Sequence, residues 1–104
     1  MFKFRDKEYE LKLNLKRLKL IEQAADNKSA MAQLATDASG MMSISAMERF
    51  FAYGLKEVGS DSFVSVSVGT EICDAIIEEK GYVAAVKIIQ EAVQRDCPFL
   101  FRVN

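Results

Sequence analysis

The sequence predicts an α+β fold in which an N-terminal β-hairpin packs on a small bundle of three to five helices, within one domain spanning residues 1–104. Three observations lead to this prediction. Apolar and charged residues alternate with period two at the start of the chain, which is typical of half-buried strands. Several later segments repeat apolar residues at helical spacing. The chain has 104 residues, 50% of them hydrophobic, which suffices for one core and is too little for two.

The first two strands are expected at Phe2–Arg5 and Glu8–Leu13, because apolar residues alternate with charged ones in both. A two-residue loop at Asp6–Lys7 joins them as a hairpin. The apolar side chains then share one face, the charged side chains share the other, and the hairpin needs a cover on its apolar face. This loop sets two opposed pairs: Phe4 with Tyr9, and Phe2 with Leu11.

A helix is expected after Asn14, which is a favourable N-cap residue. Its apolar positions recur at helical spacing: Leu15, Leu18, Ile21 and Ala25. A local positive cluster accompanies it: Lys12, Lys16, Arg17 and Lys19. Such a cluster is typical of a solvated helix face, and it also suits an acidic partner or nucleic acid.

Two segments follow before the middle of the chain. Residues 29–40 are rich in alanine and predict a short helix ended by Gly40, or a mobile loop. Ser45–Glu48 reads "SAME" and matches a capping box at the start of a helix. That helix is expected to continue to Val58, with Gly59 as its C-terminal cap.

The second half predicts two further helices. Phe63–Val68 alternates with period two and is expected to be a short strand or an extended lead-in. A helix then ends at Lys80–Gly81, and another covers about Tyr82–Arg95. Pro98 stops the last helix, and the preceding residue, Cys97, is expected to be extended. The predicted core consists of Phe2, Phe4, Tyr9, Leu11, Leu18, Phe50, Leu55, Ile76 and Ile89.

The residue content argues against several function classes. The chain has no histidine, so the common catalytic triads and histidine-containing zinc sites have no candidates. Cys73 and Cys97 are not in a C-x-x-C arrangement, and Cys73 falls in an apolar helical pattern typical of a buried free thiol. No glycine-rich phosphate-binding motif is present. We therefore expect no enzyme, no catalytic residues, no metal and no cofactor.

Charge and hydropathy bear on location and partners. The net charge is −1, which does not suggest a general nucleic-acid binder. Residues 1–52 carry nine basic and seven acidic side chains, and residues 53–104 carry five and eight, so the two halves differ mildly in sign. Such a difference is typical of two solvated surfaces, or it could help two copies meet head to tail. No apolar run approaches the length of a membrane span and no signal peptide precedes the first strand, so a cytosolic protein is expected.

Two apolar features are candidates for partner binding. Met41 and Met42 follow Gly40, and flexible methionine side chains suit adaptable binding surfaces as well as irregular core gaps. The chain also ends with large apolar residues at a terminus: Phe99, Leu100 and Phe101. Those residues either fold back on the core or form an exposed end that binds another protein.

The order of these segments resembles the tail assembly chaperones of long-tailed bacteriophages of Gram-positive hosts. The resemblance begins with "F-x-F-x-D-K-E-Y-E-L-K-L-N-L-K-x-L" and continues through "MERFFAYGLKE", "EICDAIIEEKG" and "EAVQRDCPFLF". It spans most of the chain and is weakest over residues 27–43. These motifs are hydrophobic patterns and contain no catalytic signature. Relatives are expected to have a glycine-containing turn where this chain has Arg5–Asp6.

The resemblance implies a role that composition does not. Such chaperones coat the tape measure protein, keep its hydrophobic helices soluble and recruit tail tube subunits in the host cytoplasm. They are absent from the mature virion, and their gene often yields a longer frameshifted product, of which this chain would be the short form. Self-association would help a coating protein. The alternative is a small phage regulatory or adaptor protein that binds nucleic acid through the basic helix after Asn14, although nucleic acid is the less expected partner.

Overall fold

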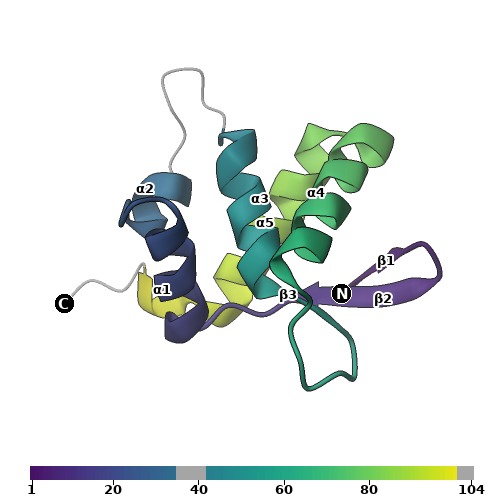
Figure 1. Ribbon diagram of the computed structural model, residues 1–104, viewed down its shortest axis with the longest axis horizontal. Helices are drawn as coiled ribbons and strands as arrows, with labels where there is room; N and C mark the ends of the chain where they lie inside the picture. Colours follow the sequence, from purple (N-terminus) through teal and green to yellow (C-terminus); the bar gives the residue numbers. More distant parts are fainter. Residues whose placement is uncertain (35–41, 101–104) are drawn as a thin grey trace.

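The computed structural model describes residues 1–34 and 42–100. Within these ranges the chain forms a three-stranded antiparallel sheet, five α-helices and one short 3-10 helix, which confirms the predicted α+β class. Helices α3, α4 and α5 pack together, with α1 and α2 on one side and the hairpin on the other (Figure 1). The elements, in order, are β1 (Phe2–Phe4), β2 (Lys7–Leu11), α1 (Leu15–Ala24), α2 (Ala30–Leu34), α3 (Ile44–Gly54), β3 (Leu55–Glu57), α4 (Val66–Lys80), α5 (Tyr82–Asp96) and η1 (Pro98–Leu100).

The hairpin forms, but its register differs from the prediction by two residues. Phe2 pairs with Tyr9 and Phe4 with Lys7, so the loop is Arg5–Asp6 rather than Asp6–Lys7. Arg5 and Asp6 both have positive φ, 49° and 70°, as a tight hairpin turn that matches the strand twist requires. Because a shift of two residues preserves the alternation of side chains, the predicted apolar face is still the buried one.

The sheet has a third strand that the sequence pattern did not reveal. Helix α3 ends at Gly54, and Leu55–Glu57 pairs antiparallel with β2, which corrects the prediction of a helix continuing to Val58. Leu55 lies opposite Leu11, and Gly54 O accepts a hydrogen bond from Lys12 N–H at 2.8 Å. The free edge of β2 therefore overrides the weak helical preference of this segment. Gly59, with φ of 88°, belongs to the turn after β3 and caps no helix.

Single polar side chains cap the starts of α1 and α3. Asn14 caps α1 as predicted, its Oδ1 accepting from Arg17 N–H at 2.9 Å. The cap of α3 is Ser43, whose Oγ accepts from Ala46 N–H at 3.1 Å, so the predicted capping box at Ser45–Glu48 is wrong. The reason is that the helix begins two residues earlier and places Ser45 inside its first turn.

Helices α3 and α4 approach each other closely at Gly69. A Cβ atom at this position would lie 2.5 Å from Phe51 O and 2.8 Å from the Cα atom of Ala52. Of Phe63–Val68, expected as a strand or an extended lead-in, only Phe63–Ser65 precedes the helix; α4 begins at Val66, and Ser65 caps it. Helix α4 ends and helix α5 begins at Gly81, as predicted.

The core confirms eight of the nine predicted residues, and Phe2 is only partly buried. Met47, Phe51 and Cys73 join them with no exposed surface. Cys73 and Cys97 are both buried free thiols. Leu15 was expected on the buried side of its helix but is 60% exposed; it is the first residue of α1, whose buried residues are Leu18 and Ile21.

The end of α5 is fastened to the connection between β2 and α1. Asp96 Oδ2 accepts from Leu13 N–H at 3.0 Å, and the Arg95 guanidinium donates to Leu11 O. Cys97 Sγ lies 3.7 Å from Leu13 O, as a weak donor to it. Cys97 has φ of −127° and ψ of 46°, so it leaves the helix without becoming extended as predicted. These contacts join the C-terminal end of α5 to the connection between β2 and α1.

Candidate partner-binding surfaces

The methionine region is not an exposed surface where the structure describes it. Met42 is 6% exposed and its backbone oxygen accepts a hydrogen bond from the Tyr82 hydroxyl, so its side chain belongs to the core. Met47 is fully buried in α3. Met41 lies outside the described residues. Because Met42 is buried, the prediction that its side chain binds a partner is not supported in this conformation.

The C-terminal apolar residues divide between core and surface. Leu100 is partly buried and packs against the core, whereas Phe99 is 38% exposed. Phe101 lies outside the described residues. Of the three terminal candidates, Phe99 is therefore the one whose described side chain is available to a partner.

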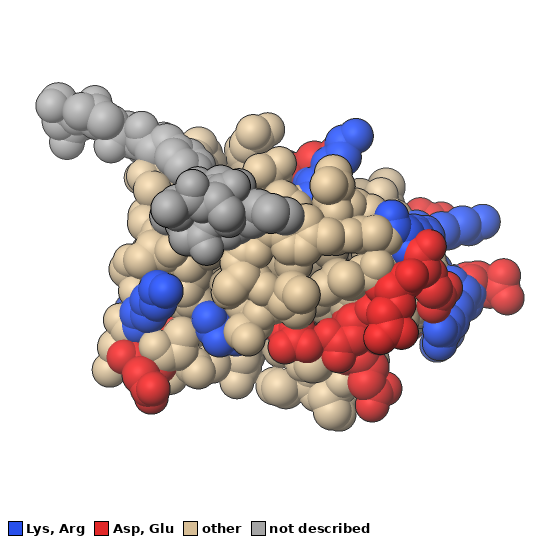
Figure 2. Space-filling model, turned by 90° about the horizontal axis from the view of Figure 1, so that it is seen from above, with Lys and Arg blue, Asp and Glu red and all other residues tan. Residues whose placement is uncertain are grey.

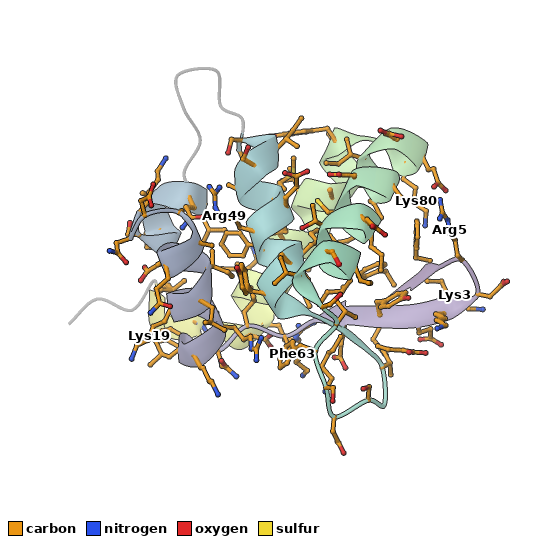
Figure 3. The ribbon with its side chains drawn as sticks, in the orientation of Figure 1. Lys3, Arg5, Lys19, Arg49, Phe63 and Lys80 are labelled. Atoms are coloured by element: carbon orange, nitrogen blue, oxygen red, sulfur yellow. The ribbon has the colours of Figure 1, made fainter. Side chains whose placement is uncertain are left out.

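The basic cluster around α1 is divided by one inward interaction. The Arg17 guanidinium carbon lies 3.8 Å from the centre of the Phe63 ring, and Nη1 donates to Tyr53 O at 3.2 Å. The cation–π contact holds α1 to Phe63, which follows β3, and the hydrogen bond holds it to Tyr53 of α3. Lys12, Lys16 and Lys19 remain exposed, and Figure 3 shows Lys19 on the outer side of α1.

A second basic group gathers at the hairpin tip, where Figure 3 shows Lys3, Arg5 and Lys80 close together. Arg5 Nη2 lies 2.7 Å from the Glu79 carboxylate, and Lys80 Nζ donates to Lys3 O at 3.2 Å. The lysine contact occupies a backbone acceptor on β1, the edge strand. These side chains therefore protect an edge that could otherwise pair with another strand.

Acidic side chains form a band on the face seen in Figure 2. Helix α4 contributes Glu71, Asp74 and Glu78, which share one side of the helix at spacings of three and four residues. Glu48 of α3 meets Asp74 across the helix pair. The pKa of Glu48 is raised to about 7 by hydrogen bonding with Asp74, by burial and by the Asp74 charge, against the opposing effect of Arg49.

This carboxyl pair predicts that stability depends on pH. Because the pKa of Glu48 is higher in the folded protein, this side chain contributes its full stability at pH values below its ordinary pKa of 4.5. The contribution is lost as the pH rises through about 7. At pH 8, Glu48→Gln should exceed the wild type in unfolding free energy by about 1 kcal/mol, and near pH 4.5 the difference should largely vanish. Urea unfolding at both values measures this.

Glu78→Gln is the matched control, because it removes an exposed carboxylate from α4, the helix that carries Asp74. It should leave the pH dependence of the wild type in place. The pairing of Glu48 with Asp74 would be refuted by a Glu48→Gln protein that follows the wild-type stability at both pH values.

The described residues offer little for covalent or metal chemistry. Within residues 1–34 and 42–100, no group of three or more histidine, cysteine, aspartate or glutamate side chains is placed to hold a metal ion. Burial and the nearby Asp74 and Glu48 charges raise the pKa of Cys73 to about 12, and burial also raises that of Cys97. Both thiols are therefore protonated at neutral pH and are poor nucleophiles.

Comparison of the chain with protein-family models, curated proteins and solved structures found no significant match. Among the helices of the described residues, none has both the length and the apolar character needed to cross a membrane.

Three surface features escaped the sequence reasoning. The exposure of Leu15, the first residue of α1, depends on which elements pack beside that end of the helix, and the spacing of apolar residues does not state this. The acidic band had a signal in the spacing of the α4 carboxylates, but the contribution of Glu48 depends on how α3 packs. The contact between Arg17 and Phe63 joins residues far apart in sequence, so no local pattern could have predicted it.

Proposed function

We propose that this protein is a non-catalytic tail assembly chaperone of a long-tailed bacteriophage or prophage. It would coat the tape measure protein in the host cytoplasm, recruit tail tube subunits, and be absent from the mature virion. The observation that carries the proposal is the ordered resemblance from the Phe2 strand to the "CPFLF" terminus. Exposed apolar side chains, Leu15 on the lysine-rich α1 and Phe99 on η1 among them, support binding of a partner rather than catalysis.

Co-expression with the tape measure protein of the same phage or prophage tests the proposal. The tape measure protein is expected in the supernatant after centrifugation when this chain is present, and in the pellet when it is absent. The double variant Leu15→Gln/Phe99→Ser should reduce this effect, and Val83→Gln, which alters an exposed apolar residue of α5, should not. Equal aggregation with and without the chain would count against the chaperone function.

The exposed lysines of α1 favour one other function, a small regulatory or adaptor protein that binds nucleic acid. This alternative has less support, because Arg17 is held inward by Phe63 and Tyr53, and because acidic side chains cover another face. Binding of random duplex DNA that weakens steeply with salt would favour it over the chaperone. Self-association also stays a prediction, and because Leu100 packs on its own core, Phe99 is the one of these two described residues that could serve it.

A further inference from the structure

The outer face of α1 combines positive charge with exposed apolar surface. Between Glu10 and Glu22 the sequence has four basic residues and no acidic one. Arg17 points inward, so the outward charges of α1 come from Lys16 and Lys19, whereas Lys12, before the helix, lies 3.7 Å from the Glu10 carboxylate. Leu15 lies among them and is 60% exposed, a large value for a leucine on a helix that buries its other side.

A second apolar side chain borders this region. The contact between Cys97 Sγ and Leu13 O brings the start of the C-terminal segment to the residue that precedes the cap of α1. Phe99 follows two residues after Cys97 and is 38% exposed. The exposed leucine and phenylalanine thus belong to segments that meet at one buried contact, and lysines accompany them.

We propose that this surface binds an acidic amphipathic helix of a partner protein. We call it the α1 docking face and define it by Leu15, Lys16, Lys19 and Phe99. Charge complementarity specifies the partner: carboxylates on its helix would meet the lysines, and apolar side chains on one side of that helix would cover Leu15 and Phe99. If the proposed chaperone function holds, the acidic helix would lie in the tape measure protein, and that assignment alone rests on the proposed function.

A helix of this kind fits the face better than nucleic acid does. The exposed leucine offers no hydrogen bond to a phosphate or a base edge, but it gains free energy when an apolar side chain covers it. The net charge of −1 and the acidic band on α3 and α4 also oppose a polyanion as long as duplex DNA. A short acidic helix can meet the lysines without approaching that band.

Two synthetic peptides test the docking face. Each has about 20 residues, long enough for substantial helix, with leucines along one side; one carries glutamate on the remaining positions and the other carries lysine. Fluorescence anisotropy should show binding of the glutamate peptide, and at least about tenfold weaker binding of the lysine peptide. Raising the salt to about 0.5 M should weaken the first interaction without abolishing it, because the apolar contact remains.

Variants locate the interaction on the protein. Lys16→Glu/Lys19→Glu should weaken binding of the glutamate peptide by about tenfold or more, and Leu15→Gln should weaken it at every salt concentration. Lys87→Glu and Val83→Gln are the matched controls, because both alter exposed residues of α5, and neither should change the affinity. All five positions are exposed, so circular dichroism melts should match the wild type.

Several results would overturn the docking face. They are equal affinity for the two peptides, undiminished binding by Lys16→Glu/Lys19→Glu, or stronger binding to random duplex DNA than to the glutamate peptide. The outcome also separates the two proposals. If the glutamate peptide binds but co-expression has no effect, the docking face stands and the chaperone function is refuted. If co-expression keeps the tape measure protein soluble but the peptide does not bind, the chaperone function stands and the docking face is refuted.

Discussion

Replacing Gly69 by alanine is expected to lower the free energy of unfolding by about 2–3 kcal/mol. The new Cβ atom would lie 2.5 Å from Phe51 O and 2.8 Å from the Cα atom of Ala52. Both are backbone atoms of a well-packed helix, so the clash cannot be relieved by turning a side chain. Helices α3 and α4 must move apart, and the buried residues between them, Cys73 and Phe51 among them, lose contacts.

The sign of this prediction opposes the intrinsic helix preference. In an exposed helix, alanine in place of glycine is worth about 1 kcal/mol of added stability. A net loss at position 69 therefore measures the close approach of the two helices. Urea unfolding gives the free energy, and Ser67→Ala, an exposed substitution on the same helix, should stay within about 0.5 kcal/mol of the wild type. A Gly69→Ala protein as stable as the wild type would mean that α3 and α4 do not approach as described.

The sequence predicted the elements better than it predicted how they join. Alternation along the first two strands set the buried face, and that result survived a register error of two residues because the error preserved the alternation. The third strand was missed because Leu55–Glu57 has no strand pattern of its own and pairs only where β2 offers a free edge. The pattern around Leu55 cannot reveal its pairing with Leu11, because the two residues are far apart in the sequence.

The same distinction applies to the candidate surface. Composition identified the basic residues around α1 but could not tell that Arg17 turns inward to Phe63 and Tyr53 while the lysines stay outside. Methionines near Gly40 suggested an adaptable surface, yet Met42 fills the core below Tyr82. Whether an apolar residue lies in the core or on the surface depends on the elements that pack over it. The sequence pattern predicts only which side of a regular helix or strand is buried.

Asp96 should be the most important charged residue for stability, because it holds the end of α5 to the start of α1. Its carboxylate accepts from Leu13 N–H at 3.0 Å and from the Arg95 guanidinium at 2.8 Å through both oxygens. Arg95 in turn donates to Leu11 O. The Asp96 side chain is only 13% exposed, so water cannot fully replace these bonds if the carboxylate is removed.

Asp96→Ala is therefore expected to cost about 2–3 kcal/mol at pH 7, since it leaves Leu13 N–H without its acceptor and frees Arg95. Asp96→Asn should cost less, because its amide oxygen can still accept from Leu13. Glu91→Ala removes an exposed carboxylate from the same helix and serves as the control. Thermal and urea unfolding of the three variants should give this order of losses, and a loss at Asp96→Ala no larger than at Glu91→Ala would contradict it.

Acid provides the second readout for Asp96. Burial alone would raise the pKa of Asp96, but hydrogen bonds from Arg95 and Leu13 N–H, with the nearby positive charges, hold it below the ordinary value of 3.8. Because the pKa of Asp96 is lower in the folded protein, the carboxylate contributes stability at pH values above its pKa in the unfolded chain. That contribution is lost as the pH falls through its pKa in the folded protein. The difference in unfolding free energy between wild type and Asp96→Ala should thus be constant from neutral pH to about 5 and shrink below about 4. A difference that stays the same at pH 3 would assign the loss to packing, and the carboxylate would not be what joins α5 to α1.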